Sequence, residues 1–337
     1  MKKFILGIIF LMLVLGCNKI TTISPFDNDS ESSQNELDSF VIYDVHEQIE
    51  SLSDAPKFLT AMDKAAVDKA VLLGSPEATF YYIEGFKNHH ENNRELMKMA
   101  KEYPDRFIVF PTIDPRDPTE LEIFKSYINE GAMGLRLFSG QYAWFYRHIG
   151  PVNRTELYPV LKYCQDNDIP IMFNMNPGKG NLQEEFEDVL KKYPNIKIIC
   201  PHFCLSSIES ERFEYLMDTY PNLYTDISFG HFFEDGLKRI SKNVSKFRYL
   251  MNKYQDRMLF GTDMVITYKT GNSSDWMYNL TMCYRNMLEK ENYDCAVKIK
   301  KVFNVSLHEL KGLALDKELL EKIYYKNPRR YLGLNLD

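Results

Sequence analysis

Three short apolar segments of the chain each lead to a residue that can bind a metal ion or transfer a proton. FVIYDVHEQI contains His46, IKIICPHF contains His202, and RMLFGTDMVI contains Asp263. Imidazole and carboxylate groups are common ligands of catalytic metals and common general acids and bases. The three positions span most of the chain, so only a fold that gathers the ends of distant strands can make one site of them.

The elements that would position these residues are eight short, nearly continuous apolar runs separated by helical patterns. The runs lie near 40–45, 69–73, 106–112, 132–138, 169–174, 196–202, 223–228 and 258–263, and the residues after 272 are assigned to the last helices. Such runs are typical of parallel strands covered on both faces. No G-x-G-x-x-G motif or P-loop supports an open, doubly wound sheet. The pattern predicts a single α/β domain, a (β/α)8 TIM barrel with functional residues where the strands end.

The first residues are interpreted as a targeting segment. Lys2 and Lys3 precede an apolar run, 4–15, which is short for a transmembrane helix and typical of a secretory signal. The run ends Leu-Val-Leu-Gly-Cys at Cys17, which resembles the lipobox of bacterial lipoproteins. The resemblance implies a signal peptide over 1–16 and lipidation of Cys17; an ordinary cleaved signal is the alternative.

Three regions therefore follow one another along the chain. After the signal peptide, residues 17–39 comprise the lipidated cysteine and a tether rich in Ser, Asn, Asp, Glu and Thr, and residues 40–337 form the barrel. A tether of this composition is flexible, and lipid chains anchor a protein to a bilayer. We expect a protein attached to a bacterial membrane through its N-terminal lipid, facing the periplasm or the cell exterior.

Charge and cysteine content narrow the choice of partners. The formal net charge is −6, the isoelectric point is about 5.8, and no block of Lys and Arg occurs, which argues against nucleic acid as a partner. Beyond Cys17 the chain has an odd set of five cysteines: Cys164, Cys200, Cys204, Cys283 and Cys295. We interpret most of them as buried free thiols and leave room for one disulfide.

In its ordered motifs the chain resembles the amidohydrolase superfamily, in particular the amidohydrolase-related (type 2) branch of decarboxylases and lactone or amide hydrolases. The resemblance runs from about residue 40 to 334 and rests on DVHEQ, VLLGSP, FPTIDP, CPHFCLS, FGTD and NPRRYLGL. It implies a barrel in which His-x-His on the first strand, a His on the fifth and an Asp on the eighth hold a divalent metal, usually zinc. A His on the sixth strand then acts near the bound water and the substrate.

Carried over by position, the resemblance gives a ligand set with two departures. His46 corresponds to the first ligand, Asp263 to the aspartate, and His202 to the sixth-strand histidine. Gln48 stands at the second histidine position and Asn174 at the fifth-strand histidine position. Because an amide oxygen is a poor zinc ligand, we expect a degenerate metal site or a metal-independent one.

Strand parity separates the residues around the first-strand histidine. Because successive side chains of a strand point to opposite faces, Asp44, His46 and Gln48 are expected on one face and Glu47 on the other. Glu47 is thus a weak replacement for a missing ligand. Cys204, beyond the sixth strand, is a second weak candidate.

Three further residues, Arg136, Asn176 and Asp226, are candidate substrate ligands near strand ends. Arg136 either clamps a substrate anion or forms an internal ion pair with Asp114 or Asp226, and Asp226 is also a candidate second catalytic carboxylate. The remaining histidines are interpreted as surface or packing residues: His89, His90, His148, His231 and His308.

Two functions remain open. The first is an amidohydrolase-type enzyme that hydrolyses or decarboxylates a small carbonyl- or carboxylate-containing substrate. Asp263 would then be a general base or metal ligand and His202 an acid–base group. The alternative is a catalytically inactive, lipid-anchored protein that retains the pocket and binds a small molecule.

Overall fold

The computed structural model describes residues 40–75, 88–138, 151–178, 180–268, 270, 273–299 and 303–335. The chain divides into two units, Met1–Ser39 and Phe40–Asp337, and every described residue belongs to the second. The predicted signal peptide, Cys17 and the tether therefore lie outside the described residues. Within the described residues, no helix is both long enough and apolar enough to cross a membrane.

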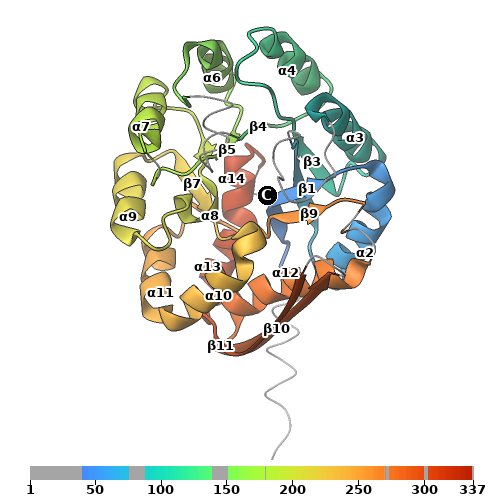
Figure 1. The fold of residues 1–337 in the computed structure, drawn as a ribbon, viewed down its shortest axis with the longest axis vertical. Helices are drawn as coiled ribbons and strands as arrows, with labels where there is room; N and C mark the ends of the chain where they lie inside the picture. The colour runs from blue at the N-terminus through green and yellow to red at the C-terminus, as the bar shows by residue number, and fades with distance from the viewer. Residues whose placement is uncertain are drawn as a thin grey trace, which may run out of the picture. The chain divides into compact units, whose positions relative to one another are not determined.

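Parallel strands surround the centre of the second unit, and helices surround the strands (Figure 1). The strands are β1 (Tyr43–Ile49), β2 (Lys69–Leu73), β3 (Phe107–Phe110), β4 (Leu135–Phe138), β5 (Ile171–Asn174), β6 (Ile198–Ile199), β7 (Leu223–Asp226) and β8 (Met258–Leu259). They pair in the order β3-β2-β1 and β4-β5-β6-β7-β8. Each overlaps one predicted apolar run, so the predicted TIM barrel is confirmed.

Contacts between the two sheets close the barrel. A parallel bridge joins Thr112, just past β3, to Arg136 on β4. On the other side, the Val45 amide donates a 2.9 Å hydrogen bond to the carbonyl of Phe260, just past β8. The chain then breaks its extended course and continues as β9 (Met264–Ile266), which pairs with β1. Asp263 lies in this break with φ 52°, a left-handed conformation that turns the chain at the end of the eighth strand.

The outer layer consists of amphipathic helices. They are α2 (Ala55–Lys64), α3 (His89–Glu102), α4 (Glu120–Asn129), α6 (Tyr158–Asp166), α7 (Leu182–Lys192), α9 (Ser210–Thr219), α10 (Phe233–Lys242), α11 (Val244–Lys253) and α12 (Ser274–Glu289). In α2, for example, Phe58, Ala61 and Met62 are buried at helical spacing. The helices cover the outside of the strands, which explains why the strands read as continuously apolar.

The barrel interior is packed with apolar side chains from the strands and from the end of the chain. Inward-facing residues such as Val45, Leu73 and Leu259 form one cluster with Tyr331 and Leu332. The last two belong to α14 (Asn327–Tyr331) and the residue after it, which follow α13 (Lys317–Glu321) and a π-helical turn, η5 (Lys322–Lys326). Each large apolar side chain buried in this way stabilises the fold by about 1.5–3 kcal/mol.

A β-hairpin follows α12, where the sequence analysis expected only helices. β10 (Asn292–Ile299) and β11 (Phe303–Lys311) pair antiparallel. Exposed and buried residues alternate along all of β10, as expected for a strand with one solvent-facing side. The expectation was wrong because polar and apolar residues alternate in NYDCAVKI with the period of a strand, directly after the helical pattern of α12.

The expectation of mostly free thiols was also wrong. Among the described residues Cys200 bonds to Cys204 and Cys283 to Cys295, while Cys164 is free and buried. The second disulfide joins α12 to β10, two elements whose contact depends on the unexpected hairpin. The first spans a tight turn after β6, which is described below.

Candidate functional site

At the carboxyl end of the strands, His46 from β1 lies between two aspartates. Its Nδ1 is 2.7 Å from Oδ2 of Asp226, and its Nε2 is 3.0 Å from Oδ1 of Asp263. Burial lowers the pKa of His46, but the charges of Asp263 and Asp226 outweigh burial and raise this pKa to about 9. His46 is therefore an imidazolium at neutral pH, and it links the end of β7 to the end of β8.

The second histidine, His202, stacks on the first. The ring centroids of His46 and His202 are 5.2 Å apart with 27° between the ring planes. Nδ1 of His202 is 3.1 Å from the carbonyl oxygen of Ser228 and 2.8 Å from its Oγ, which itself donates to Asp226. A carbonyl oxygen only accepts, so Nδ1 carries the proton. The lone pair of neutral His202 is then on Nε2, which lies 3.6 Å from Oδ2 of Asp263.

The charge states of these groups follow from burial and from one another. Burial lowers the pKa of His202; the charges of Asp263 and Asp226 oppose this shift, and the pKa remains below its usual value. Burial raises the pKa of Asp263, but the positive charge of His46 outweighs burial and lowers it overall. The Asp263 side chain keeps 11 % of its surface exposed, whereas His202 keeps 3 %. An ionised carboxylate thus lies beside a neutral imidazole at the barrel mouth.

Asp226 holds both histidines in place. Its Oδ1 accepts the backbone amides of His202 at 2.9 Å and Ser228 at 3.0 Å and the Ser228 hydroxyl at 2.7 Å, while Oδ2 binds His46. Burial raises the pKa of Asp226, but these partners lower it overall. Both oxygens are occupied and the side chain is fully buried. This arrangement assigns Asp226 to positioning His46 and His202, and not to the substrate contact that sequence analysis predicted.

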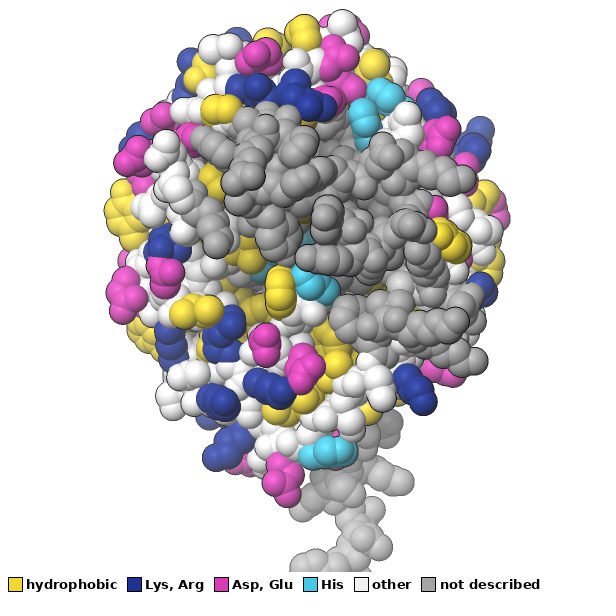
Figure 2. Space-filling view, viewed as in Figure 1, with side chains coloured by type: hydrophobic (Ala, Val, Ile, Leu, Met, Phe, Trp, Pro, Cys, Tyr) yellow, Lys and Arg dark blue, Asp and Glu magenta, His cyan; other side chains and the backbone are white. Residues whose placement is uncertain are grey.

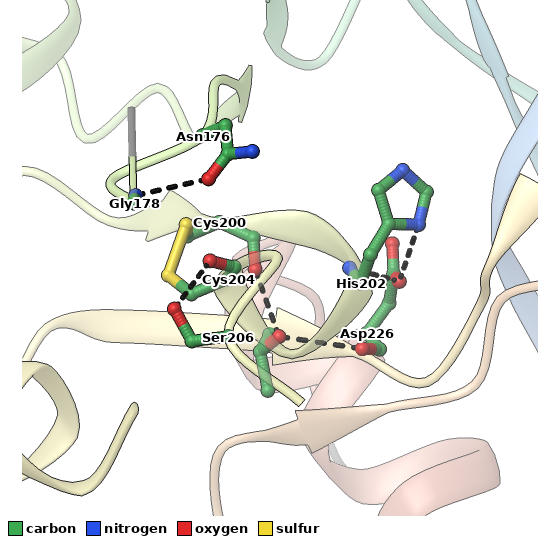
Figure 3. Close-up of a disulfide and its surroundings, with 8 residues drawn as sticks. Asn176, Gly178, Cys200, His202, Cys204, Ser206 and Asp226 are labelled. Carbon is green, nitrogen blue, oxygen red and sulfur yellow. Dashed lines mark hydrogen bonds and ion pairs between the residues drawn. A yellow bond between two sulfur atoms is a disulfide. The ribbon is translucent and has the colours of Figure 1, made fainter. Parts of the chain in front are cut away.

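His202 reaches this position because the backbone coils left-handed after β6. In α8 (Pro201–Cys204) and the next residue, φ is 60° at His202, 53° at Phe203, 54° at Cys204 and 49° at Leu205. Each such residue costs about 1–2 kcal/mol relative to right-handed backbone. The Cys200–Cys204 disulfide spans the turn with Cα atoms 4.8 Å apart. Figure 3 shows the disulfide on one side of the turn and the His202 ring on the other.

Gln48, at the second ligand position implied by the resemblance, has a fixed amide orientation. Nη1 of Arg136 donates to Oε1 of Gln48 at 3.1 Å, and the Ser75 hydroxyl donates to the same oxygen at 2.8 Å. A guanidinium can only donate, so Oε1 must face Arg136 and Nε2 must face away from it. Nε2 then donates to Oδ1 of Asp263 at 2.6 Å. Asp263 therefore meets an N–H group where the resemblance implied a lone pair directed at a metal.

Arg136 is completely buried, and it pairs with no carboxylate among the described residues. Nη1 also donates to the carbonyl of Gly74 at 2.9 Å, and the guanidinium lies 4.9 Å from the centroid of the Phe138 ring. Nε and Nη2 have no hydrogen-bond partner in the part of the chain that the structure describes. Burial lowers the pKa of Arg136 to about 10, against the charge of Asp263, so the side chain stays cationic at neutral pH.

Neither carboxylate proposed as an internal partner of Arg136 takes that role. Asp114 pairs with Arg116 at 2.5 Å, and Asp226 binds the two histidines. A buried cation with unpaired N–H groups is unfavourable unless an anion compensates it. The internal ion pair of Arg136 with Asp114 or Asp226 is therefore not formed, and the binding of a substrate anion by Arg136 stays a prediction.

The two asparagines after β5 differ in their contacts. Asn174 is buried and its Oδ1 has no hydrogen-bond partner among the described residues. Asn176 instead accepts from the Gly178 amide at 2.9 Å, and Figure 3 shows its side chain turned toward Gly178. Asn174 thus has an amide oxygen without a partner among the described residues at the end of a strand, whereas the side chain of Asn176 stabilises the turn that contains it.

A β-bulge in β1 changes which residues share a face. The register of β1 against β2 shifts between Asp44 and Glu47. The Asp44 carboxyl interacts directly with that of Glu47, and both accept from Thr262, Asp44 from its amide and Glu47 from its hydroxyl. Burial raises the pKa of Asp44 to about 6 and raises that of Glu47. The parity prediction that grouped Asp44 with His46 was wrong, because a bulge adds one residue to the strand.

One residue that the sequence analysis did not place at the site lies against Asp263. Gly230, which begins η4 (Gly230–Phe232), has φ +54°, and a Cβ there would approach Oδ2 of Asp263 to 2.4 Å. His231, which follows it, is exposed, in agreement with its interpretation as a surface or packing residue, and it also interacts electrostatically with Asp263. A single Gly-His pair in a loop carries no sequence signal that would have identified Gly230.

The candidate metal ligands do not fit the ion that the resemblance implied. His46, His202 and Asp226 offer ligand atoms within 4.8 Å of one another. However, Nδ1 of His46 is hydrogen-bonded to Asp226, and its Nε2 faces Asp263. Gln48 directs an N–H toward the same carboxylate. A metal needs lone pairs, whereas the Gln48 amide directs an N–H at Asp263; Nε2 of His46 has no hydrogen-bond partner among the described residues. The cluster is arranged for ion pairs and hydrogen bonds.

Comparison with known proteins identifies the relatives of this arrangement. A family model described as Amidohydrolase matches residues 46–334. No curated protein matches the chain.

Several solved structures share the barrel. A probable 2-pyrone-4,6-dicarboxylic acid hydrolase from Acinetobacter baumannii, with citric acid bound, has 14 % identity and a TM-score of 0.57 over 87 % of this chain and 99 % of that one. An amidohydrolase from Burkholderia multivorans with bound zinc has 11 % identity and a TM-score of 0.57, and the match covers 88 % of this chain and 100 % of that one. A 5-carboxyvanillate decarboxylase from Sphingomonas paucimobilis has 11 % identity and a TM-score of 0.51, and the match covers 88 % of this chain and 100 % of that one. At these identities the likeness shows the fold.

Proposed function

The chain belongs to the amidohydrolase family, and we propose that it is an enzyme that cleaves a small carboxylate substrate without the metal ion of its relatives. The observation that carries the proposal is the buried guanidinium of Arg136, whose Nε and Nη2 have no partner among the described residues. These N–H groups match the geometry with which arginine binds a carboxylate. Hydrolase and decarboxylase relatives, one of them holding citric acid, are consistent with such a substrate.

The chemistry would be performed by Asp263 and His202. Nε2 of neutral His202 can accept a proton from a water molecule that the ionised carboxylate of Asp263 orients, since the two groups lie 3.6 Å apart. The hydroxide formed would attack a carbonyl carbon of a substrate whose carboxylate is bound by Arg136. The His202 imidazolium would then return the proton to the leaving group.

Two buried cations would replace the charge that a metal supplies elsewhere. The His46 imidazolium keeps Asp263 ionised, and the charge of Arg136 acts on the same carboxylate. The described cluster thus contains two cations, His46 and Arg136, against two anions, Asp226 and Asp263. Fixed charges in a buried site stabilise developing negative charge without reorganisation.

The alternative function, a binding protein without catalysis, is favoured by one observation. Oδ1 of Asp263 is already occupied by the Gln48 amide and faces His46, which leaves mainly Oδ2 for chemistry. Such a capped carboxylate would bind a ligand well and activate water poorly.

One experiment separates the two functions. The purified full chain is incubated, with and without a strong chelator, with a panel of small lactones and amides that carry a carboxylate. Turnover that survives chelation, and that Asp263→Asn abolishes, supports the metal-independent enzyme. Ligand binding without turnover, lost in Arg136→Met and retained in Asp263→Asn, supports the binding protein.

We also propose that Cys17 carries lipid and anchors the protein at the outer side of a bacterial membrane. The lipobox-like ending at Cys17 supports this location. The disulfides Cys200–Cys204 and Cys283–Cys295 are compatible with it, because disulfides persist in exported proteins.

A further inference from the structure

Away from the barrel mouth, two histidines and a glutamate form a compact group where α3 and α4 begin. Nε2 of His89 lies 3.0 Å from Oε1 of Glu120, and Nε2 of His90 lies 3.3 Å from the same oxygen. The two imidazole rings have centroids 4.0 Å apart, and all three ligand atoms lie within 4.8 Å of one another. Figure 2 shows histidine side chains at the surface between α3 and α4.

The glutamate of this group is buried, and one of its two carboxylate oxygens lacks a hydrogen-bond partner among the described residues. Glu120 is 2 % exposed, and its Oε2 has no hydrogen-bond partner in the part of the chain that the structure describes. The His89 and His90 side chains are 21 % and 30 % exposed, so solvent reaches the group from one side. A buried carboxylate with a free oxygen is costly unless a cation compensates it.

Protonated histidines are a poor source of that cation. Two imidazolium rings with centroids 4.0 Å apart would repel each other. Neutral imidazoles instead present lone pairs, which a metal ion can share. The His90 backbone is also fixed, because its amide donates to Oδ1 of Asn88 at 2.8 Å.

We propose that His89, His90 and Glu120 bind a zinc-class divalent metal ion, with water in the fourth position. Zinc binds imidazole nitrogen and carboxylate oxygen at about 2.0–2.2 Å, which places tetrahedral ligand atoms about 3.4 Å apart. The observed N···O separations of 3.0 and 3.3 Å are close to this value. The ion would join the first turn of α3 to that of α4 and stabilise the folded chain.

The site is distinct from the candidate active site in both residues and consequence. α3 and α4 follow β2 and β3 along the chain, whereas His46 lies on β1 and His202 and Asp263 follow β6 and β8. Arg94 and Asp117 act on His90 with opposite charges, so the negative charge of the group comes from Glu120. Loss of the ion should therefore lower stability and leave the acid–base pair of the barrel mouth intact.

Zinc binding by the full chain can be measured by competition with a chromophoric chelator, and thermal unfolding can be followed with and without zinc. We expect one equivalent of zinc and a higher unfolding midpoint. Glu120→Gln and His90→Asn should each weaken binding at least 10-fold and abolish the shift in midpoint. Cobalt bound at the site should show the intense visible absorption of a tetrahedral nitrogen and oxygen complex, which Glu120→Gln should remove.

Two matched variants control for other sites. His308→Asn removes an exposed histidine that contacts Asp294 and Ser306 on the hairpin, and His46→Asn removes the histidine of the barrel mouth. Both should retain the equivalent of zinc. The proposal is overturned if the folded chain binds no zinc, if Glu120→Gln and His90→Asn bind it as tightly as the parent, or if His46→Asn abolishes binding. Circular dichroism of each variant separates lost binding from lost folding.

Discussion

Nε2 of Gln48 lies 2.6 Å from Oδ1 of Asp263, so an N–H group meets the carboxylate that the resemblance assigns to a metal ion. In the family pattern both positions direct lone pairs at one ion. Here Arg136 fixes Oε1 of Gln48, which turns an N–H toward the carboxylate. Arg136 and Gln48 thus form one unit, and a substitution of either residue should change the orientation or the hydrogen bonds of the other.

Restoring the implied ligands should rebuild a metal site. Gln48→His with Asn174→His replaces two amides by imidazoles around His46 and Asp263. Since changes outside a ligand shell already alter affinity 10- to 100-fold, we expect a gain of at least about 100-fold in zinc affinity at this site, measured by chelator competition. Glu120→Gln in the same background removes the proposed surface site from the measurement. A double variant that binds zinc no better than this background would show that the four positions do not converge.

Arg136→Met should have opposite effects on stability and on substrate binding. Removing a buried cation that lacks a carboxylate partner should raise the free energy of unfolding by about 1–4 kcal/mol, measured by denaturant titration. The same change should raise KM or Kd for a carboxylate ligand at least 10-fold, because the anion clamp is lost. Unchanged affinity for a ligand that carries a carboxylate would contradict the assigned role.

The pKa of His46 predicts how stability depends on pH. Its folded pKa, about 9, lies above the unfolded value near 6.5. The stabilisation is therefore fully present below about pH 6.5 and is lost as pH rises through 9, a difference of roughly 3 kcal/mol. Unfolding titrations between pH 6 and 10 should show this decline. In Asp226→Asn the decline should be smaller and begin at lower pH, and an identical profile would exclude His46 as its source.

The two disulfides should differ in their effect on catalysis. Cys200→Ser with Cys204→Ser frees the left-handed turn that carries His202, so kcat should fall along with a stability loss of about 2 kcal/mol. Cys283→Ser with Cys295→Ser opens a bridge between α12 and β10 and should cost about 3 kcal/mol without changing kcat. Equal kcat values for both pairs, below their unfolding temperatures, would mean that the first bridge does not position His202.

The location can be tested through Cys17. Cys17→Ser should abolish lipidation and move the chain from the membrane to the soluble fraction of cells, detected by fractionation and mass spectrometry. A chain lacking the first 17 residues should be soluble and unlipidated as well. Continued membrane association of normally processed Cys17→Ser would rule out the lipid anchor.

The barrel was accessible from sequence because apolar runs alternate with helical patterns, and because His46, His202 and Asp263 end such runs. The prediction from strand parity was wrong at Asp44, because β1 has a bulge there. The bulge depends on the pairing of β1 with β2, so the sequence of β1 alone does not indicate it. The amide orientation of Gln48 was equally hidden, since it depends on Arg136, 88 positions further along the chain.

Cysteine pairing and the roles of short loops were inaccessible for a related reason. Cys283 meets Cys295 only because β10 packs beside α12, and Cys200 meets Cys204 only through a run of left-handed residues. Gly230 has to be a glycine because the Asp263 carboxylate leaves no room for a Cβ atom at this position. Each of these features is a property of tertiary contacts, to which local patterns are blind.

The interior position of Tyr331 and Leu332 sets the order in which this chain can complete its fold. The Asn327 amide group also donates to the carbonyl of Met258 at 2.8 Å, which ties α14 to the base of β8. Tyr331 and Leu332 therefore complete a core that the strands alone leave unfilled, and a chain truncated before α14 would have an open barrel. The eight strands thus depend on a helix far from most of them in the sequence, so the barrel is stable only when both ends of the described domain are present together.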